Sequence, residues 1–387
     1  MAMEVKLLQP VKVVCTDDLG ETLVDIMQTA GYSRPLMVTD SFVGSMPLVV
    51  AARTKLEQVG VDVAVFDQVK PDPLCETVES GVEAFEAHKA DSIIAIGGGS
   101  SMDVARGINI VRVNGGSIIE YTDPAKPIAP CNGMIAVPTT AGTGSEMSNA
   151  LVVTEGSTGR KLAVLADPAV SEHAVLNADL MLTLPAKMTI ACGLDAFCHA
   201  AEGYLSRMAS PVTDAICEKA MFLLYNYLPR AVANGQDREA RERVMVASTL
   251  AGWMLNNAGT IAGHSIAHVL GAKYHIVHGE AVGYALPAVM EFVAPVRAHK
   301  VREIGQILGA VYPENAPDEQ VAIIASRAFK DFRDRMLGLH PVEDYGISVE
   351  ELVSNAQAVV DERFAGNTPR DIDLQAAEQL LEGFGSR

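Results

Sequence analysis

The first half of the chain alternates short apolar runs with stretches of helical periodicity, and this alternation limits its possible folds more than any other feature. The apolar runs are residues 11–14, 35–39, 61–66, 93–96 and 134–137, and the helical patterns between them include 19–30, 48–59 and 75–89. Strands that alternate with helices form a parallel sheet with helices on both faces. We therefore predict an α/β domain over residues 1–184, which ends at a domain boundary near Leu184-Pro185.

The second half has a different pattern. Helical periodicity covers 239–254, 297–308 and 318–336, and Ser210-Pro211 has the residue types that begin a helix, with serine as N-cap and proline at the first position. Residues 281–294 also have a helical pattern, although Pro287 should kink or break it. These patterns predict an all-helical domain over residues 185–387.

Composition excludes several classes of partner. The chain has 48 acidic and 30 basic residues, a net charge of −18, which disfavours binding to nucleic acid or to anionic membranes. No apolar run reaches the roughly 18 residues that span a bilayer. Residues 1–14 lack the apolar core and cleavage site of a signal peptide. The six cysteines form no CxxC pair, so we expect free thiols in a cytoplasmic protein.

Two glycine-rich loops follow successive predicted strands. Residues 97–100, GGGS, follow the strand 93–96 and precede a predicted helix, where glycine lets a pyrophosphate approach the backbone and the helix N-terminus. The pattern is not GxGxxG, so a turn that needs glycine for steric reasons remains the alternative. Residues 138–146, PTTAGTGSE, are either a second phosphate or ribose loop or a flexible turn. Together they favour a nucleotide site, because ligands of such sheets bind outside the carboxyl ends of the strands.

Asp40 closes the predicted strand 35–39 and has two possible roles. Its carboxylate can accept hydrogen bonds from an adenosine ribose and would repel a 2′-phosphate, which favours NAD(H) over NADP(H). Equally, it can be the N-cap of a helix that begins at Ser41.

A second group of residues predicts a metal site. Four of the nine histidines, His264, His268, His275 and His278, fall within fifteen residues. Upstream, Asp195 and His199 are four residues apart on a predicted helix and so share one face. Three imidazoles and one carboxylate suit zinc, iron(II), nickel or manganese. Spacing alone does not select the ligands among the four histidines, and the alternative is a set of packed core histidines.

Cys192 and Cys198 lie on either side of Asp195 in the sequence. They are either softer metal ligands or packed small residues, and we favour packing. A metal site and a nucleotide site on one α/β chain predict redox chemistry.

Four segments together resemble the signatures of the iron-containing (group III) alcohol dehydrogenase family. They are GGGSSMD (97–103), PTTAGTGSE (138–146), GLDAFCHAAEGY (193–204) and residues 267–279, and the resemblance extends from Asp40 to the NTPRD segment 367–371. It implies a dehydroquinate synthase-like architecture, with a nucleotide-binding domain, a helical domain and an active site between them. It also implies an NAD(H)-dependent alcohol dehydrogenase or aldehyde reductase with Fe²⁺ or Zn²⁺, acting on a small alcohol or aldehyde as a homodimer or larger assembly.

The resemblance also implies roles for individual residues. The metal ligands would be Asp195, His199, His264 and His278. His268 would lie beside the metal as a catalytic proton-relay group, and His275 would line the cleft without being a ligand. The residues that contact the cofactor would be Asp40, Gly98, Gly99, Ser100, Thr139, Thr140, Thr143 and Lys161.

Two departures from the family pattern bear on the substrate. Val282 stands where an asparagine is common and Ala288 where a histidine is common, which indicates a less polar wall and a substrate other than a small diol. The alternatives are a zinc-dependent polyol dehydrogenase, a metal-independent reductase resembling the maleylacetate reductases, and a lyase resembling dehydroquinate synthase. A non-enzymatic alternative is a structural metal site in a nucleotide-sensing protein. The complete set of ligands counts against the metal-independent reductase.

Overall fold

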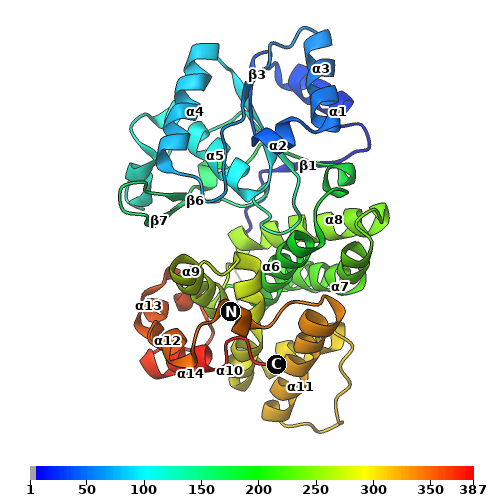
Figure 1. Ribbon diagram of the computed structural model, residues 1–387, viewed down its shortest axis with the longest axis vertical. Coiled ribbons are helices and arrows are strands. Elements are labelled where there is room, and N and C mark those ends of the chain that lie inside the picture. Colours follow the sequence, from blue (N-terminus) through cyan, green and yellow to red (C-terminus); the bar gives the residue numbers. More distant parts are fainter. Residues whose placement is uncertain (1–5) are drawn as a thin grey trace. The chain divides into compact units, whose positions relative to one another are not determined.

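The computed structural model describes residues 6–387, and the chain divides into two compact units (Figure 1). One unit is Leu8–Leu182, and the other is Thr183–Arg387 with the described residues that precede Leu8. Residues 1–5, the start of the segment in which we expect no signal peptide, lie outside the described residues. Within the described part of the chain, no helix combines the length and apolarity needed to cross a membrane.

The first unit contains the predicted parallel sheet. Its six strands are all parallel and lie in the order β1-β8-β5-β4-β2-β3. Each of the five predicted runs overlaps one strand, whereas β8 was not predicted. The strands are β1 (Lys12–Cys15), β2 (Pro35–Val38), β3 (Ala64–Phe66), β4 (Ser92–Gly97), β5 (Met134–Pro138) and β8 (His173–Leu176).

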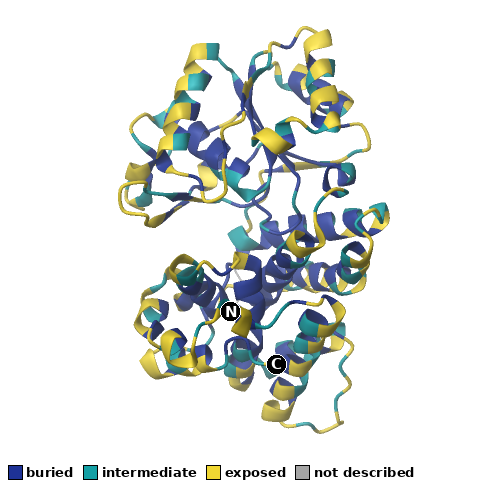
Figure 2. Cartoon of the chain, in the orientation of Figure 1, coloured by how far each residue is buried: buried dark blue, intermediate teal, exposed yellow. Residues whose placement is uncertain are grey.

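Helices cover both faces of this sheet. Met37, Ile94 and Val137 pack with α1 (Leu19–Ala30) and α3 (Pro47–Gln58). Their strand neighbours, such as Val38 and Ala95, pack on the other face with α4 (Cys75–His88) and α5 (Gly99–Asn114). The strands β2, β4 and β5 are buried on both faces, and such strands have continuous apolar sequences, which is why these three runs were recognisable (Figure 2). Short helical turns complete the unit: α2 (Ser41–Gly44), η1 (Ile118–Thr122), η2 (Asp167–Ala169) and η3 (Ala178–Met181).

The first unit also contains an antiparallel hairpin that the sequence analysis did not predict. It consists of β6 (Ala150–Thr154) and β7 (Lys161–Leu165), and its side chains Leu151 and Val164 join the core on the α5 side of the sheet. Exposed and buried positions alternate along β7, the period-two signal of a half-buried strand.

The second unit is entirely helical in the described residues. At its centre, α6 (Ala186–Leu205) is buried continuously from Gly193 to Leu205 and packs against α7, α8 and α10. The other elements are α7 (Pro211–Ala233), α8 (Arg238–Asn257), α9 (Ala262–Tyr274), α10 (His278–Ile307), α11 (Asp318–Lys330), the π-helical η4 (Asp331–Met336), η5 (Val342–Tyr345), α12 (Val349–Val353), α13 (Ala356–Asp361), η6 (Arg363–Asn367) and α14 (Leu374–Glu382). The fold class is therefore as predicted.

The break in α10 differs from the prediction. The helix runs through Pro287, and its backbone leaves the helical conformation at Arg297, two residues after Pro295. The predicted helices 281–294 and 297–308 are thus the two arms of this one broken helix. The structure therefore places the break at Arg297, and the break expected at Pro287 was wrong.

Candidate metal centre and nucleotide loops

Helix α6 supplies the carboxylate and the first imidazole of the cluster. Asp195 and His199 are four residues apart, so they project from one face of α6, and both are buried. Oδ1 of Asp195 lies 3.6 Å from Nε2 of His199.

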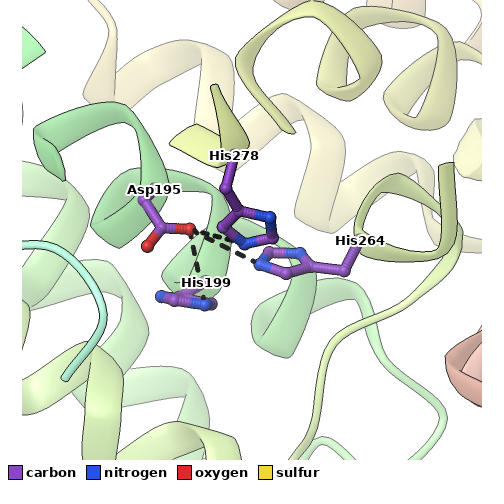
Figure 3. A group of neighbouring side chains, drawn as sticks. All are labelled: Asp195, His199, His264 and His278. Carbon is purple, nitrogen blue, oxygen red and sulfur yellow. Dashed lines mark ion pairs between the residues drawn. The ribbon is translucent and has the colours of Figure 1, made fainter. Parts of the chain in front are cut away.

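Helices α9 and α10 supply the other two imidazoles (Figure 3). Oδ1 of Asp195 lies 3.8 Å from Nε2 of His264 and 3.4 Å from Nε2 of His278. His264 is buried, whereas the side chain of His278 is 43 % exposed, which leaves one side of the cluster accessible. Ligand atoms of all four residues lie within 4.8 Å of one another, and residues 6–387 contain no other such group of three or more His, Cys, Asp or Glu side chains.

These separations fit a single divalent ion. Ligands about 2.1 Å from a tetrahedral metal lie about 3.4 Å from each other, close to the three observed distances. Oδ1 of Asp195 and Nε2 of His264 are also buried without a hydrogen-bond partner in the structure. Buried polar atoms normally have a hydrogen-bond partner. A metal ion bound between these two atoms would explain why each lacks one.

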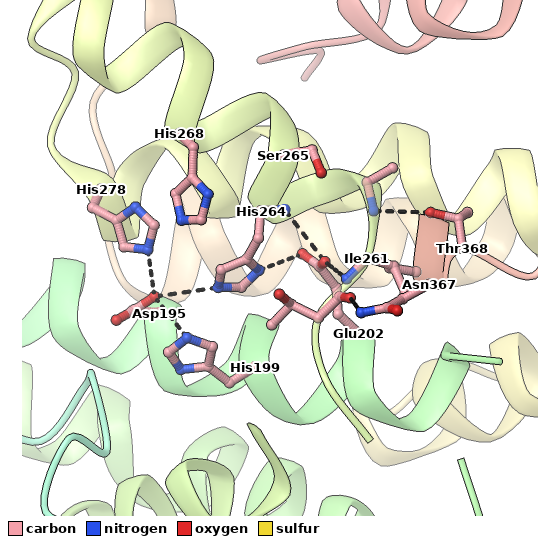
Figure 4. Close-up of polar contacts among 12 residues, drawn as sticks. Asp195, His199, Glu202, Ile261, His264, Ser265, His268, His278, Asn367 and Thr368 are labelled. Atoms are coloured by element: carbon pink, nitrogen blue, oxygen red, sulfur yellow. Dashed lines mark hydrogen bonds and ion pairs between the residues drawn. The ribbon is translucent and has the colours of Figure 1, made fainter. Parts of the chain in front are cut away.

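Glu202 fixes the orientation of His264. It lies one turn beyond His199 on α6 and is fully buried. Its Oε1 lies 2.9 Å from Nδ1 of His264, and its Oε2 accepts hydrogen bonds from the backbone N–H groups of Ile261 and His264 at 2.7 and 3.3 Å (Figure 4). A carboxylate on Nδ1 assigns the ring proton to that nitrogen and leaves the Nε2 lone pair for the metal. Sequence reasoning missed this residue, although its spacing from Asp195 places it on the same face.

Two glycines allow the three helices to approach. A Cβ on Gly279 would overlap the carbonyl oxygen of Ala191 on α6, and a Cβ on Gly263 would overlap the carboxylate of Glu202. Gly279 follows His278, and Gly263 precedes His264. Glycine at these two positions therefore lets α9 and α10 bring His264 and His278 close to α6.

The charges in the cluster act on each other. Burial would raise the pKa of Asp195, but His199, His278 and His264 outweigh burial and hold the pKa well below its usual value. Burial would lower the pKa of His264, but Glu202 and Asp195 raise it to about 9. The pocket thus pairs an anionic carboxylate with a protonated imidazole, and a divalent cation bound there would take the place of the proton on Nε2 of His264.

His268 lies beside the cluster. Its ring stacks on that of His278 at 5.4 Å between centroids and meets the edge of His264 at 6.2 Å. Burial, helped by these two neighbours, holds the pKa of His268 below its ordinary value despite the carboxylate of Glu362.

The remaining candidates lie outside the set of four. His275 is exposed and ends α9 in a left-handed conformation, with φ of 57°. Burial raises the pKa of Cys192 to about 12 and raises the pKa of Cys198 well above its usual value, and neither thiol belongs to the cluster of four ligand atoms.

The two glycine-rich loops of the first unit contact each other. They leave the adjacent strands β4 and β5, and the N–H of Thr139 donates to the carbonyl of Gly97 at 2.9 Å. A Cβ on Gly98 would lie 3.3 Å from Cγ2 of Thr140, and a Cβ on Gly99 would lie 3.0 Å from Cγ2 of Thr143. Gly98 is the N-cap of α5, so Gly99 and Ser100 present the N-terminus of this helix at the carboxyl edge of the sheet.

Asp40 and Lys161 have structural partners of their own. Oδ1 of Asp40 accepts hydrogen bonds from the N–H groups of Phe42 and Val43, both at 2.9 Å, so the residue caps α2. Its other oxygen lies toward Gly97, 4.0 Å from the position of a Cβ there. Lys161 lies on the hairpin strand β7, and its Nζ pairs with Asp72 at 2.5 Å.

Both units match models of one protein family. Residues 10–178 match the iron-containing alcohol dehydrogenase model, and residues 189–384 match the C-terminal region of the Fe-containing alcohol dehydrogenase family. The chain belongs to the iron-containing alcohol dehydrogenase family. The resemblance drawn from the four signature segments is therefore confirmed.

Similar proteins support the assignment to the iron-containing alcohol dehydrogenases. The chain is 34% identical to the NAD-dependent methanol dehydrogenase of Bacillus methanolicus, over 92% of this chain and 93% of that protein. The solved alcohol dehydrogenase of Oenococcus oeni is 29% identical, with a TM-score of 0.91 over 98% of this chain and 99% of that one. The sulfoacetaldehyde reductase of Bifidobacterium kashiwanohense, solved with NAD⁺, is 26% identical, with a TM-score of 0.88 and full coverage of both chains.

As an iron-containing alcohol dehydrogenase, the protein is an NAD-dependent oxidoreductase of alcohols and aldehydes with a metal-binding site. Enzymatic redox chemistry is thus confirmed, and the nucleotide-sensing alternative is set aside. The lyase alternative is set aside as well, because both units match the dehydrogenase family.

Proposed function

We propose that the protein interconverts an alcohol and an aldehyde with NAD(H), using Fe²⁺ bound by Asp195, His199, His264 and His278. The observation that carries this proposal is the convergence of these four ligand atoms within 4.8 Å. A divalent ion there would act as a Lewis acid toward the substrate oxygen. In the oxidative direction, the alcohol loses a hydride from carbon to NAD⁺ and a proton from oxygen, which gives the aldehyde, NADH and H⁺.

Iron is proposed over zinc on family membership, since the donor set suits both metals. Zn²⁺ is the alternative, and with it a polyol dehydrogenase. Both assignments use the same four ligands. They are distinguished by which metal restores turnover after the bound metal has been removed with a chelator.

His268 is the proposed catalytic proton-relay residue. Its ring stacks on His278, and its lowered pKa keeps the imidazole neutral near pH 7, so one ring nitrogen retains a lone pair.

The cofactor is proposed to bind at the carboxyl edge of the sheet in the first unit. The contacts between the loops after β4 and β5, and the glycines at the start of α5, support this site. The proposed contact residues are Asp40, Gly98, Gly99, Ser100, Thr139, Thr140, Thr143 and Lys161. The carboxylate of Asp40 supports a preference for NAD(H), which is the cofactor named for the relative from Bacillus methanolicus.

The substrate is proposed to be an alcohol or aldehyde of low polarity rather than a small diol. Phe364 lies beside His268, with 5.5 Å between ring centroids, and Val282 is an apolar residue on the same helix as His278. Ala288, the other departure from the family pattern, lies next to Gly383, where a Cβ on that glycine would be 2.9 Å away.

We further propose a cytoplasmic homodimer or larger homo-oligomer. The six free cysteines support a reducing compartment. Light scattering on the purified protein would measure the number of subunits.

The test is metal analysis and NADH oxidation measured on one preparation, purified without oxygen. We expect close to one iron per chain and turnover with a panel of apolar and polar aldehydes. Chelation should abolish turnover, and Fe²⁺ should restore it better than Zn²⁺. Full activity in metal-free protein would overturn the role of the four ligands, and restoration by zinc alone with preference for a diol would favour the polyol enzyme.

A further inference from the structure

We propose that Glu362 is a positioning residue that holds His268 in one orientation and one tautomer, with its Nε2 atom as the acceptor for the hydroxyl of a bound alcohol. The inference rests on the proposed function, because it assigns that function's proton-relay residue its orienting partner.

The contacts of Glu362 define its charge state. Its Oε1 lies 2.9 Å from Nδ1 of His268, and its Oε2 accepts hydrogen bonds from Oγ of Ser265 at 2.6 Å and from the N–H of Phe364 at 2.8 Å. Burial would raise the pKa of this carboxyl, but His268, Ser265 and Phe364 outweigh burial and lower it. An ionised carboxylate only accepts hydrogen bonds, so Nδ1 of His268 must carry the proton.

The tautomer of His268 then follows. A neutral imidazole protonated on Nδ1 has its lone pair on Nε2. The ring is held between its neighbours, stacked on His278 at 5.4 Å and packed against Phe364 at 5.5 Å between centroids. Rotation of the ring would break the bond to Glu362, so this bond also fixes which nitrogen serves as acceptor.

The segment that carries Glu362 is anchored to the start of α9. Oγ1 of Thr368 accepts a hydrogen bond from the N–H of Ala262 at 3.1 Å, and Nδ2 of Asn367 donates to the carbonyl of Thr260 at 3.0 Å (Figure 4). Glu362 is 94 residues from His268 in the sequence. These two hydrogen bonds hold the segment of Glu362 against α9, the helix that carries His264 and His268. The backbone around Glu362 is therefore fixed where its carboxylate meets His268.

The variant E362Q tests the tautomer directly. The amide oxygen should stay with the two donors Ser265 and Phe364, so that the NH₂ group faces Nδ1 of His268. Nδ1 must then accept a hydrogen bond, and the proton moves to Nε2, which can no longer act as the acceptor. Nitrogen NMR of the histidine-labelled full chain, loaded with diamagnetic Zn²⁺ and assigned with H268N, should report Nδ1–H in the parent and Nε2–H in E362Q.

Kinetics provide the second readout. We expect kcat of E362Q to fall roughly 10–100-fold, the usual effect of losing a group that orients a functional histidine, with little change in KM for NAD⁺ and in bound metal. E362D, which keeps the carboxylate, should recover part of kcat. The matched control is D361N, which removes a charge at the adjacent exposed position, where Oδ1 of the carboxylate accepts a hydrogen bond from Nε2 of Gln357.

A double-mutant comparison separates positioning from a general structural role. If Glu362 acts through His268, E362Q should add little to the loss already caused by H268A, because the two residues act as one unit. Additive losses, an unchanged His268 tautomer, or kcat of E362Q equal to that of D361N would each overturn the proposal. Absence of NAD-linked turnover in the parent protein would instead overturn the proposed function, whereas a normal parent with an unaffected E362Q would overturn this inference alone.

Discussion

Glu202 directs His264 into the metal cluster: its Oε1 lies 2.9 Å from Nδ1 of that ring, and both residues are buried. The other oxygen of Glu202 accepts the backbone N–H groups of Ile261 and His264. One carboxylate thus fixes the backbone at the start of α9 and the tautomer of His264. His268 and Glu362 repeat this arrangement one turn later.

Replacing Glu202 with glutamine should weaken metal binding. The amide oxygen should remain with the two backbone donors, so the NH₂ group would face Nδ1 of His264 and leave the ring proton on Nε2. We expect metal affinity to fall roughly 10–100-fold, measured by competition with a chelator. D361N is the charge-matched control and should bind metal like the parent. Equal affinities for E202Q and D361N would contradict this account of the tautomer.

Adding a methyl group at Gly279 should separate α10 from α6. Its Cβ would overlap the carbonyl oxygen of Ala191, and backbone cannot yield as a side chain can. We expect G279A to lose about 1–3 kcal/mol of stability and to bind metal more weakly, because His278 moves away from Asp195. G283A is a graded comparison on the same helix, since its Cβ would meet the end of Leu194 at 3.2 Å. Thermal unfolding and metal content measure both effects, and equal behaviour of the two variants would argue against the backbone clash.

Arg106 should be necessary for the conformation of the proposed nucleotide-binding loop, residues 138–146. It is fully buried, and its guanidinium donates to the carbonyls of Ser145 at 2.6 Å, of Ala169 at 3.3 Å and of Ala150. R106M would leave these carbonyls unsatisfied, at a cost of roughly 2–4 kcal/mol. NADH binding, followed by titration, should weaken while metal content stays at the parental level, because the four proposed metal ligands belong to the other unit. Unchanged NADH affinity in a folded R106M would show that the loop does not depend on the hydrogen bonds of Arg106.

The charge of Asp40 can be removed without removing its helix cap. Asparagine and aspartate are comparable N-caps, so D40N should keep α2 and change stability by less than about 1 kcal/mol. If Asp40 also faces the ribose, D40N should raise kcat/KM for NADP⁺ relative to NAD⁺ on the order of tenfold, since the repulsion of a 2′-phosphate disappears. D40A would lose the cap as well and serves to separate the two roles. A cofactor preference that does not change in D40N would leave Asp40 with capping alone.

Much of the fold was readable because parallel strands are buried on both faces. The runs around Ile94 and Ile135 are continuously apolar, and each ends in a glycine- or threonine-rich loop at the same edge of the sheet. The hairpin β6–β7 escaped prediction because its strands are half-exposed and carry a weaker alternating signal. Pro287 was misjudged, because the break of α10 falls ten residues further on, at Arg297.

The sequence by itself determined which residue types could meet. Asp195 and His199 share a helical face by their spacing alone, and this periodicity needs no knowledge of the rest of the chain. Spacing alone left open which of the four later histidines join them, the family resemblance implied His264 and His278, and the tertiary structure brings these two to the same place. Close packing at Gly263 and Gly279 brings His264 and His278 to α6. His268 instead forms a hydrogen bond with Glu362, and His275 caps the end of α9. Glu362 has no local signal, because its contact depends on the packing of segments far apart in the chain, and such contacts are fixed only when the helices assemble.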